Sequence, residues 1–192
     1  MVNENKFSLE QTQKNSWIFE IRILKEILND LEGEILFEFS IPRMGKRVDV
    51  ILIIRNVIFV FEFKVGEKEF FSSSVDQVWD YALDLKNFHE TSHKPLIARI
   101  LIATNSKNVL SFIGTTKHND NILIPIKTNS ALLRKVIEDV LQFADGDLID
   151  YKNWESGRYS PTPTIIEAAL ALYNNHSVND ITRKDADAVN LS

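Results

Sequence analysis

The segment that most restricts the fold comprises residues 48–64, which read VDVILIIRNVIFVFEFK. It contains two apolar runs, rich in the β-branched and aromatic residues that strands favour, on either side of the polar pair Arg55-Asn56. This pattern predicts a β-hairpin whose turn is centred on that pair. A symmetric turn places Asp49 opposite Glu62, with their Cβ atoms roughly 5 Å apart, and Lys64 points to the same face as Glu62.

Two carboxylates and an ammonium group at the end of an otherwise apolar hairpin need a physical explanation. Burying unpaired charge is costly, and neighbouring like charges increase that cost. A divalent cation bound by Asp49 and Glu62 would relieve both effects, so we expect a metal site there. The alternative is an ordinary ion pair between Glu62 and Lys64 at a strand edge, but the matched register of Asp49 favours the metal site.

The composition is typical of a globular protein. The chain has 192 residues, of which 44% are hydrophobic and 26% are charged, which is enough for one domain with a substantial core. No run reaches the ~18 apolar residues of a membrane span, and the first residues lack the pattern of a secretory signal. Without cysteine the chain has neither disulfides nor thiolate metal ligands. We therefore expect a cytoplasmic protein without membrane contact.

The distribution of charge bears on nucleic-acid binding. A net charge of −5 argues against non-specific binding to nucleic acid, although a bound cation would neutralise an acidic cluster. Arg43, Lys46 and Arg47 form a basic group just before Asp49. We expect Arg43 and Arg47 to contact phosphate groups, and a solvated turn is the alternative.

The order of predicted elements indicates an α/β fold with a central mixed sheet flanked by helices. Residues 97–104 are nearly all apolar, as in a strand buried beside a parallel neighbour. After residue 145 we expect order to weaken. The sequence pattern predicts a helix at 12–31, a strand at 34–41, the hairpin, a helix at 74–88, strands at 97–104 and 122–126, a helix at 130–143 capped by Asn129 or Ser130, a linker at 160–164, a short helix at 165–174 and a polar end at 177–192.

Glu20 is a further candidate, because it lies at the edge of the apolar stripe of the first predicted helix. An acid that faces a sheet must be paired, neutral or bound to a metal. The alternative is a flanking carboxylate that reaches solvent or pairs with a lysine.

Gln77 and Tyr81 are one helical turn apart and could hold a phosphate or a water molecule beside the carboxylates. Ser74 and Gln77 also fit a capping box, in which Gln77 only closes the start of the helix. Tyr81 could equally pack among apolar neighbours.

His89 and His93 have the i, i+4 spacing of a helical zinc site. The segment HETSHKP leads into a proline, however, and is typical of a helix end. Loop or capping roles are therefore preferred for both histidines.

These residues together resemble a known family. Asp49 followed by Glu62-Phe63-Lys64 resembles the D…(D/E)xK motif of the PD-(D/E)XK, or restriction-endonuclease-like, nucleases, with Val48 where the family pattern has proline. Glu20 matches the acidic residue of the family's first core helix, and Gln77 with Tyr81 matches the QxxxY motif of RecB-type exonucleases. The resemblance spans about residues 17–104 and implies a restriction-endonuclease-like sandwich with an αβββαβ core.

A longer resemblance extends along the chain. IPRMGKRVDV, EFKVGE and QVWDYALDLKNFHETSH are similar to the amino-terminal region of bacterial nuclease–helicase fusions that continue into a Schlafen-group-3-like superfamily 1 helicase, some of which act in phage defence. This resemblance implies a nuclease-like domain at 1–150. Residues 151–192 would then be a linker with short helices leading to a helicase domain that is absent here, since the sequence contains no G-x-x-x-x-G-K-[ST] motif.

The resemblance also implies a mechanism. Asp49, Glu62 and Glu20 would bind Mg²⁺ or Mn²⁺, together with the Phe63 carbonyl, and Lys64 would orient the attacking water or stabilise developing charge. The residues implied to position the nucleic acid, most simply DNA, are Gln77, Tyr81, Arg43 and Arg47. A catalytically inactive binding module on the same fold and a purely structural interaction domain are the alternatives. RNA as substrate, strandedness, end or internal cutting and oligomeric state are left open.

Overall fold

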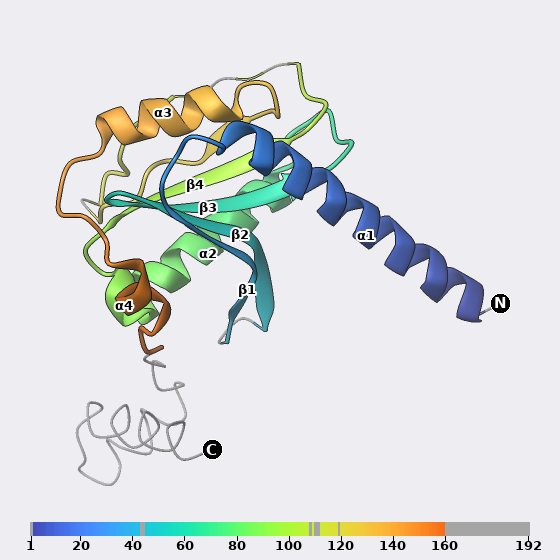
Figure 1. Cartoon of the computed structure of the whole chain (residues 1–192), viewed down its shortest axis with the longest axis horizontal. Coiled ribbons are helices and arrows are strands. Elements are labelled where there is room, and N and C mark those ends of the chain that lie inside the picture. Colours follow the sequence, from blue (N-terminus) through green and yellow to red (C-terminus); the bar gives the residue numbers. More distant parts are fainter. Residues whose placement is uncertain (1, 43–44, 108, 110–111, 119, 160–192) are drawn as a thin grey trace, which may run out of the picture.

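The computed structural model describes residues 2–42, 45–107, 109, 112–118 and 120–159. Helices, strands and one short 3-10 helix alternate along this part of the chain (Figure 1). They are α1 (Val2–Ile27), β1 (Glu34–Ile41), β2 (Lys46–Ile54), β3 (Val57–Lys64), α2 (Ser72–Phe88), η1 (Glu90–Ser92), β4 (Leu96–Ala103), β5 (Ile126–Thr128), α3 (Leu133–Phe143) and α4 (Tyr151–Glu155).

The five strands form one mixed sheet in the order β1-β2-β3-β4-β5. The first three strands pair antiparallel, whereas β4 runs parallel to both β3 and β5. Every residue of β4 is buried, as its continuous apolar sequence predicts for an inner parallel strand. The α/β class and the mixed sheet are therefore confirmed.

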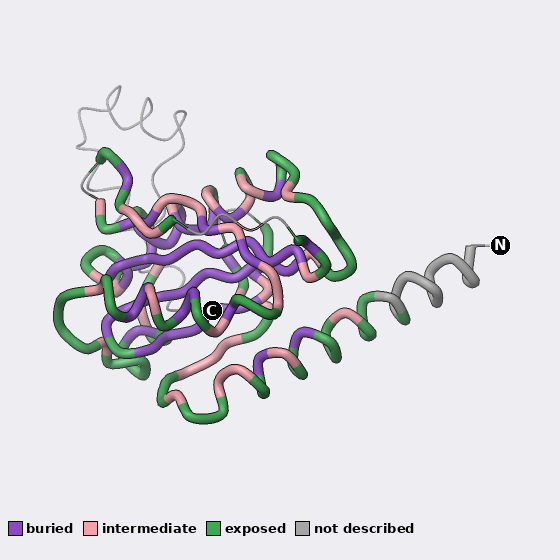
Figure 2. Tube along the Cα trace, turned by 90° about the horizontal axis from the view of Figure 1, so that it is seen from above, coloured by how far each residue is buried: buried purple, intermediate pink, exposed green. Residues whose placement is uncertain are grey.

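Helices cover both faces of the sheet (Figure 1). Leu24 of α1 and the apolar face of α3 pack on one face with Val50, Leu52 and Phe61. On the other face, Tyr81 and neighbouring residues of α2, together with Trp154 of α4, form a second core. Figure 2 shows the strands buried along most of their length, whereas α1 is buried only at isolated positions. None of the helices in the described ranges combines the length and apolar character that a bilayer-spanning segment needs.

The hairpin matches its prediction closely. Arg55-Asn56 forms the turn, and the register pairs Ile54 with Val57 and Leu52 with Phe59. Arg55 adopts the left-handed backbone conformation, with φ of 55°. A positive φ at the first turn residue is typical of the tight turns that match strand twist.

Several predicted boundaries are wrong because tertiary contacts decide them. The first helix begins before residue 12 and ends at Ile27, where the Arg134 side chain donates to the Ile27 carbonyl at 2.6 Å. Ile122 and Leu123 form isolated bridges, and the fifth strand is Ile126–Thr128. The helix α3 starts at Leu133 with Leu132 as its N-cap, so neither predicted capping residue occupies that position.

The segment beyond residue 145 is also more ordered than expected as far as residue 159. It contains α4, whose Trp154 is fully buried against Phe39 and His89. The predicted linker at 160–164, the helix at 165–174 and the polar end at 177–192 lie outside the described residues, as does Arg43.

Candidate active site

In β1 and β2 the alternation of side chains between the two faces of the sheet is interrupted at one position. This interruption determines where Asp49 lies. Val50 packs under α1 and α3, but Val48 packs under α2, so the usual alternation of side chains is interrupted between them. The regular pairing of β2 with β3 ends at Val50 and Phe61, one pair short of the expected Asp49–Glu62 pair. Instead, Asp49 Oδ2 accepts a hydrogen bond of 2.7 Å from the backbone N–H of Phe63. The Asp49 carboxylate is thus held at the point where the two strands separate.

Glu62 lies in the same cavity as Asp49 and is the more deeply buried of the two acids. One of its oxygens, Oε1, accepts a hydrogen bond of 2.8 Å from Lys64 Nζ, as expected for residues i and i+2 of one strand. The other oxygen, Oε2, is buried and has no hydrogen-bond partner among the described residues. Burial raises the pKa of Glu62, and the Lys64 ammonium and the Gln77 side chain oppose that rise. An unpaired buried carboxylate oxygen is costly, and an ion or a water molecule bound to it would remove that cost.

A chain of hydrogen bonds connects Lys64 to helix α2 and then back to β2. Lys64 Nζ donates to Gln77 Oε1 at 3.3 Å, Gln77 Nε2 donates to the Tyr81 hydroxyl at 2.7 Å, and that hydroxyl donates to the Arg47 carbonyl at 3.0 Å. The helix begins at Ser72 with Phe71 as its N-cap, so the alternative capping box at Ser74 is not formed. Gln77 and Tyr81 therefore orient Lys64 relative to β2.

Helix α1 brings Glu20 to this site from the other face of the sheet. Leu24, one turn further along the helix, is buried in the core and fixes the orientation of the helix. Glu20 is itself buried, with 7% of its surface exposed. Burial and then the charges of Asp49, Glu38 and Glu62 raise the pKa of Glu20 to about 8. Burial and the charge of Glu62 likewise raise the pKa of Asp49.

Glu38 belongs to the site but was not among the predicted residues. The register of β1 with β2 pairs Phe37 with Val50 and Phe39 with Val48, so Glu38 lies opposite Asp49. Its backbone is left-handed, with φ of 51°. Strained non-glycine conformations of this kind concentrate at functional sites. A turn centred on the segment PRMG between the two strands would have revealed this pairing from the sequence.

The side chain of Glu38 is held by two neighbours. Trp17 Nε1 donates to Glu38 Oε1 at 2.8 Å, and Arg47 Nη1 lies 3.5 Å from Glu38 Oε2. The Arg47 side chain is 65% exposed, so it lies at the rim of the site beside Glu38. Arg43, predicted with Arg47 to contact phosphate groups, lies outside the described residues.

The two histidines of the FHETSH segment lie away from the carboxylates and serve the end of α2. His89 is the C-cap of α2, and its Nδ1 is hydrogen-bonded to Ser92 Oγ at 2.7 Å. His93 Nδ1 lies 2.7 Å from the Lys86 carbonyl oxygen. The preferred capping and loop roles are confirmed, and the two histidines do not lie on one helix as the helical zinc alternative required.

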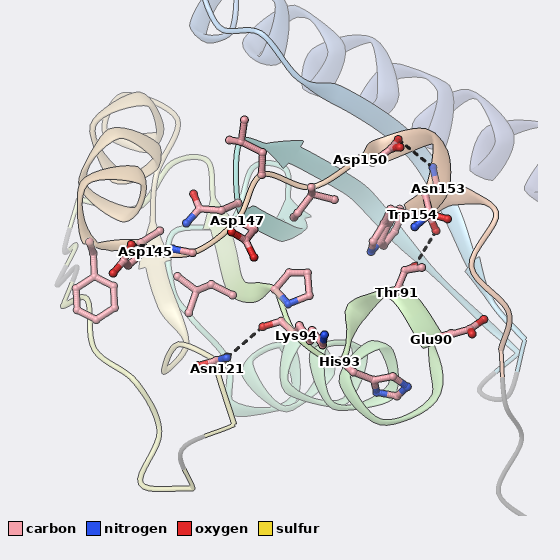
Figure 3. A pocket seen from close by; sticks show the side chains of 18 of the residues that line it. Glu90, Thr91, His93, Lys94, Asn121, Asp145, Asp147, Asp150, Asn153 and Trp154 are labelled. Atoms are coloured by element: carbon pink, nitrogen blue, oxygen red, sulfur yellow. Dashed lines mark hydrogen bonds between the residues drawn. The ribbon is translucent and has the colours of Figure 1, made fainter.

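Four of the predicted residues, Glu20, Asp49, Glu62 and Lys64, line a cavity of about 350 Å³. The other three that the structure describes line a different hollow, of about 590 Å³; they are Arg47, Gln77 and Tyr81. A larger cavity, of about 690 Å³, lies at the opposite end of the sheet between η1 and the segment that precedes α4 (Figure 3). It contains none of the predicted site residues. The side chains that line the smaller cavity and carry charge are Glu20, Glu38, Asp49, Glu62, Lys64 and Glu67.

The smaller cavity is suited in its chemistry to a hard divalent cation. Its donors are carboxylate oxygens, which Mg²⁺ and Mn²⁺ prefer. Glu62 Oε2 is buried without a partner, and the pKa values of Glu20 and Asp49 are raised, both of which a cation would relieve. In the part of the chain that is described, no three acid or histidine side chains already converge as a complete metal-binding group. The residues present nevertheless suit such an ion, because they offer carboxylate oxygens, negative charge and one buried oxygen without a hydrogen-bond partner.

Comparison with models of known protein families gave no match, and comparison with curated proteins gave none either.

Proposed function

We propose that this chain is a metal-dependent nuclease domain of the restriction-endonuclease-like class that hydrolyses phosphodiester bonds in DNA. The observation that carries the proposal is the buried, unpartnered Oε2 of Glu62 in a cavity shared with Asp49, Glu20 and Lys64. The observed order of one helix, three strands, a helix and a strand agrees with the core that the motif resemblance implies. By the same resemblance, the domain would work with a helicase, in the same chain or separately, in DNA processing or phage defence.

Asp49, Glu62 and Glu20 are the residues that would hold Mg²⁺ or Mn²⁺. The ion would supply, when bound, a lowered pKa for a water nucleophile and polarisation of the scissile phosphate. The protein holds these acids on three different elements, α1, β2 and β3, so the fold must be intact for the site to exist.

The other side chains would position the substrate and neutralise its negative charge. Lys64, tied to Gln77 and through it to Tyr81, presents its ammonium group where negative charge develops during hydrolysis. Because the guanidinium of Arg47 is exposed at the rim, it would hold a neighbouring phosphate without reading sequence. Arg43 is proposed for the same role from its position in the sequence.

The proposal is tested by a panel of labelled single- and double-stranded DNA and RNA substrates incubated with Mg²⁺, Mn²⁺ or a chelator. We expect metal-dependent cleavage, and at least ~100-fold slower cleavage by Asp49→Ala and by Lys64→Ala, because each removes an electrostatic group from the site. Glu69→Ala, which removes an exposed acid outside the cavity, is the control and should cleave normally. Cleavage by purified Asp49→Ala at the wild-type rate would refute the assignment.

A second candidate function is a binding module on the same fold that cuts nothing. It is favoured by one observation, that the described acids are not already gathered into a metal-binding group. Calorimetric titration with Mg²⁺ separates the two, since a binding module need not bind the ion. A gel shift at several salt concentrations then measures whether phosphate contacts contribute to DNA affinity.

A further inference from the structure

A second, apolar cavity adjoins the candidate active site between α1 and β1. It has a volume of about 250 Å³ and is lined by Trp17, Ile21 and Phe37, with Glu20, Glu38 and Asp49 along one side. The aromatic side chains are open to solvent, with 39% of Trp17 and 43% of Phe37 exposed. Large apolar side chains that share an exposed hollow are a common sign of a binding site.

This cavity lies next to the proposed catalytic cavity, because four residues line both of them: Trp17, Glu20, Glu38 and Asp49. The charged groups are confined to the shared side, where the cation would lie. The remaining lining, Ile21 and Phe37, is apolar. An occupant that suits both cavities therefore has an apolar, planar part joined to an anionic part.

The aromatic lining is held in place before any ligand arrives. The Trp17 indole N–H donates to Glu38 Oε1 at 2.8 Å, which limits rotation of the ring. The backbone of Phe37 is fixed by the pairing of β1 with β2, opposite Val50, and this sets the direction of its side chain. Rigid aromatic surfaces bind planar ligands with little loss of side-chain entropy.

We propose that the hollow formed by Trp17, Ile21 and Phe37 binds the base of a nucleotide next to the scissile phosphate, so that the substrate is single-stranded DNA. This inference rests on the proposed nuclease function. The cavity volume lies below the ~300–1,000 Å³ of pockets that hold drug-sized ligands, which suits one base and not a segment of folded protein.

The strandedness follows from the availability of the base. Aromatic side chains stack on any base, so such a site is tolerant of sequence. In a duplex the base is paired and stacked, and its extrusion costs a few kcal/mol before it can enter the cavity. A single strand offers its bases without that cost.

The test measures binding separately from cleavage. Binding is measured in a Lys64→Ala background with Mg²⁺, because this variant is expected to cleave slowly. The fluorescence anisotropy of a labelled oligothymidylate of twelve nucleotides then reports the affinity. We expect Trp17→Ala and Phe37→Ala each to weaken binding about 5- to 150-fold, the range for loss of one base–aromatic stack. Phe19→Ala, which removes a ring of α1 that is 37% exposed but lies outside the hollow, should change nothing.

Three further measurements decide the interpretation. Trp17→Phe should recover most of the affinity, which separates loss of stacking from loss of folding. An abasic strand of the same length should bind equally to the background protein and to its Trp17→Ala variant, and the duplex should bind more weakly than the single strand. Equal weakening with the abasic strand, unchanged affinity in both aromatic variants, or self-association of the protein that Trp17→Ala abolishes would each overturn the base site.

Failure of the base site is distinguishable from failure of the nuclease proposal. If the wild-type protein cleaves DNA with metal but the aromatic variants bind normally, only the base site is wrong. If no substrate is cleaved under any condition, the nuclease proposal is wrong, whatever the anisotropy shows.

Discussion

At the scale of single residues, the site is defined by acids that the protein keeps close together at a cost. Glu20 and Glu62 are buried, and Glu38 has a left-handed backbone at the position opposite Asp49. Burial and the charges of Asp49, Glu38 and Glu62 raise the pKa of Glu20, and burial and the charges of Glu62 and Glu38 raise the pKa of Asp49, which means that the ionised cluster destabilises the metal-free protein. A site of this kind gains stability when it binds a cation, because the ion binds the folded state.

This arrangement makes stability depend on pH in a direction that can be measured. The pKa of Glu20 is about 8 in the folded protein, against 4.5 as the ordinary value, so between those pH values the folded state binds more protons than the unfolded state. Stability of the metal-free protein should therefore fall as pH rises from about 4.5 to about 8. Glu20→Gln cannot ionise, and we expect its Tm to exceed that of the wild type at about pH 8 by a margin that vanishes near pH 4.5.

The control for that measurement is Glu26→Gln, an exposed acid on the same helix, whose Tm should follow the wild type at every pH. Addition of Mg²⁺ at about pH 8 should raise the Tm of the wild type more than that of Glu20→Gln. A Tm difference between Glu20→Gln and wild type that does not change with pH would contradict the role assigned to this carboxyl.

At the scale of elements, the hairpin shows how local chemistry sets a register. Its turn is so short that the two strands can pair in only one way, and that pairing brings β3 alongside β2 with Glu62 near Asp49. The turn is not optimal, because Arg55 has a positive φ that glycine adopts without strain.

We expect Arg55→Gly to stabilise the protein by about 0.5 kcal/mol. Relief of the left-handed conformation is worth about 1–2 kcal/mol, and the greater freedom of glycine in the unfolded chain offsets about 0.5–1 kcal/mol of it. Urea unfolding followed by circular dichroism measures the difference. Arg55→Ala is the matched control and should not stabilise the protein, since alanine has the same steric conflict. A less stable Arg55→Gly would show that the guanidinium contributes more than the backbone strain costs.

At the scale of the whole molecule, the segment after α3 closes the second core. Trp154 of α4 is fully buried, its indole N–H donates to Ser92 Oγ at 2.9 Å, and its ring contacts Phe39 and His89. This part of the chain therefore belongs to the same cooperative unit as the sheet.

Replacement of Trp154 by alanine should destabilise the protein by about 3–5 kcal/mol, because it removes a large side chain from a packed core. Tyr151→Ala in the same helix removes a side chain that is 42% exposed and should cost less than about 0.5 kcal/mol. Equilibrium unfolding in urea, monitored at two wavelengths, gives both values. A small effect of Trp154→Ala, or an unfolding transition confined to the end of the chain, would show that α4 is an independent addition.

Much of the fold could be predicted from local pattern. The strand at Glu34–Ile41, the hairpin register and the buried parallel strand β4 follow from alternation, turn chemistry and continuous apolar sequence. The end of α1 could not be predicted, since the Ile27 carbonyl accepts a hydrogen bond from Arg134, which is remote in the sequence. Arg134 lies in the first turn of α3, whose start could not be predicted either. The ordered segment around Trp154 was missed for the same reason, because its partners are Phe39 of β1 and His89 at the end of α2, both remote in the sequence.

The sequence by itself determined which groups are present and which of them share a strand or a helix face: Glu62 with Lys64, and Gln77 with Tyr81. Only the tertiary structure decided that Glu20 reaches them from α1 and that Trp17 borders the site. It also decided that Asp49 accepts a hydrogen bond from the Phe63 backbone N–H at the point where β2 and β3 separate. The alternation of side chains is interrupted at that point of β2. Spacing along the chain is a local property, whereas the meeting of residues from different elements depends on how those elements pack.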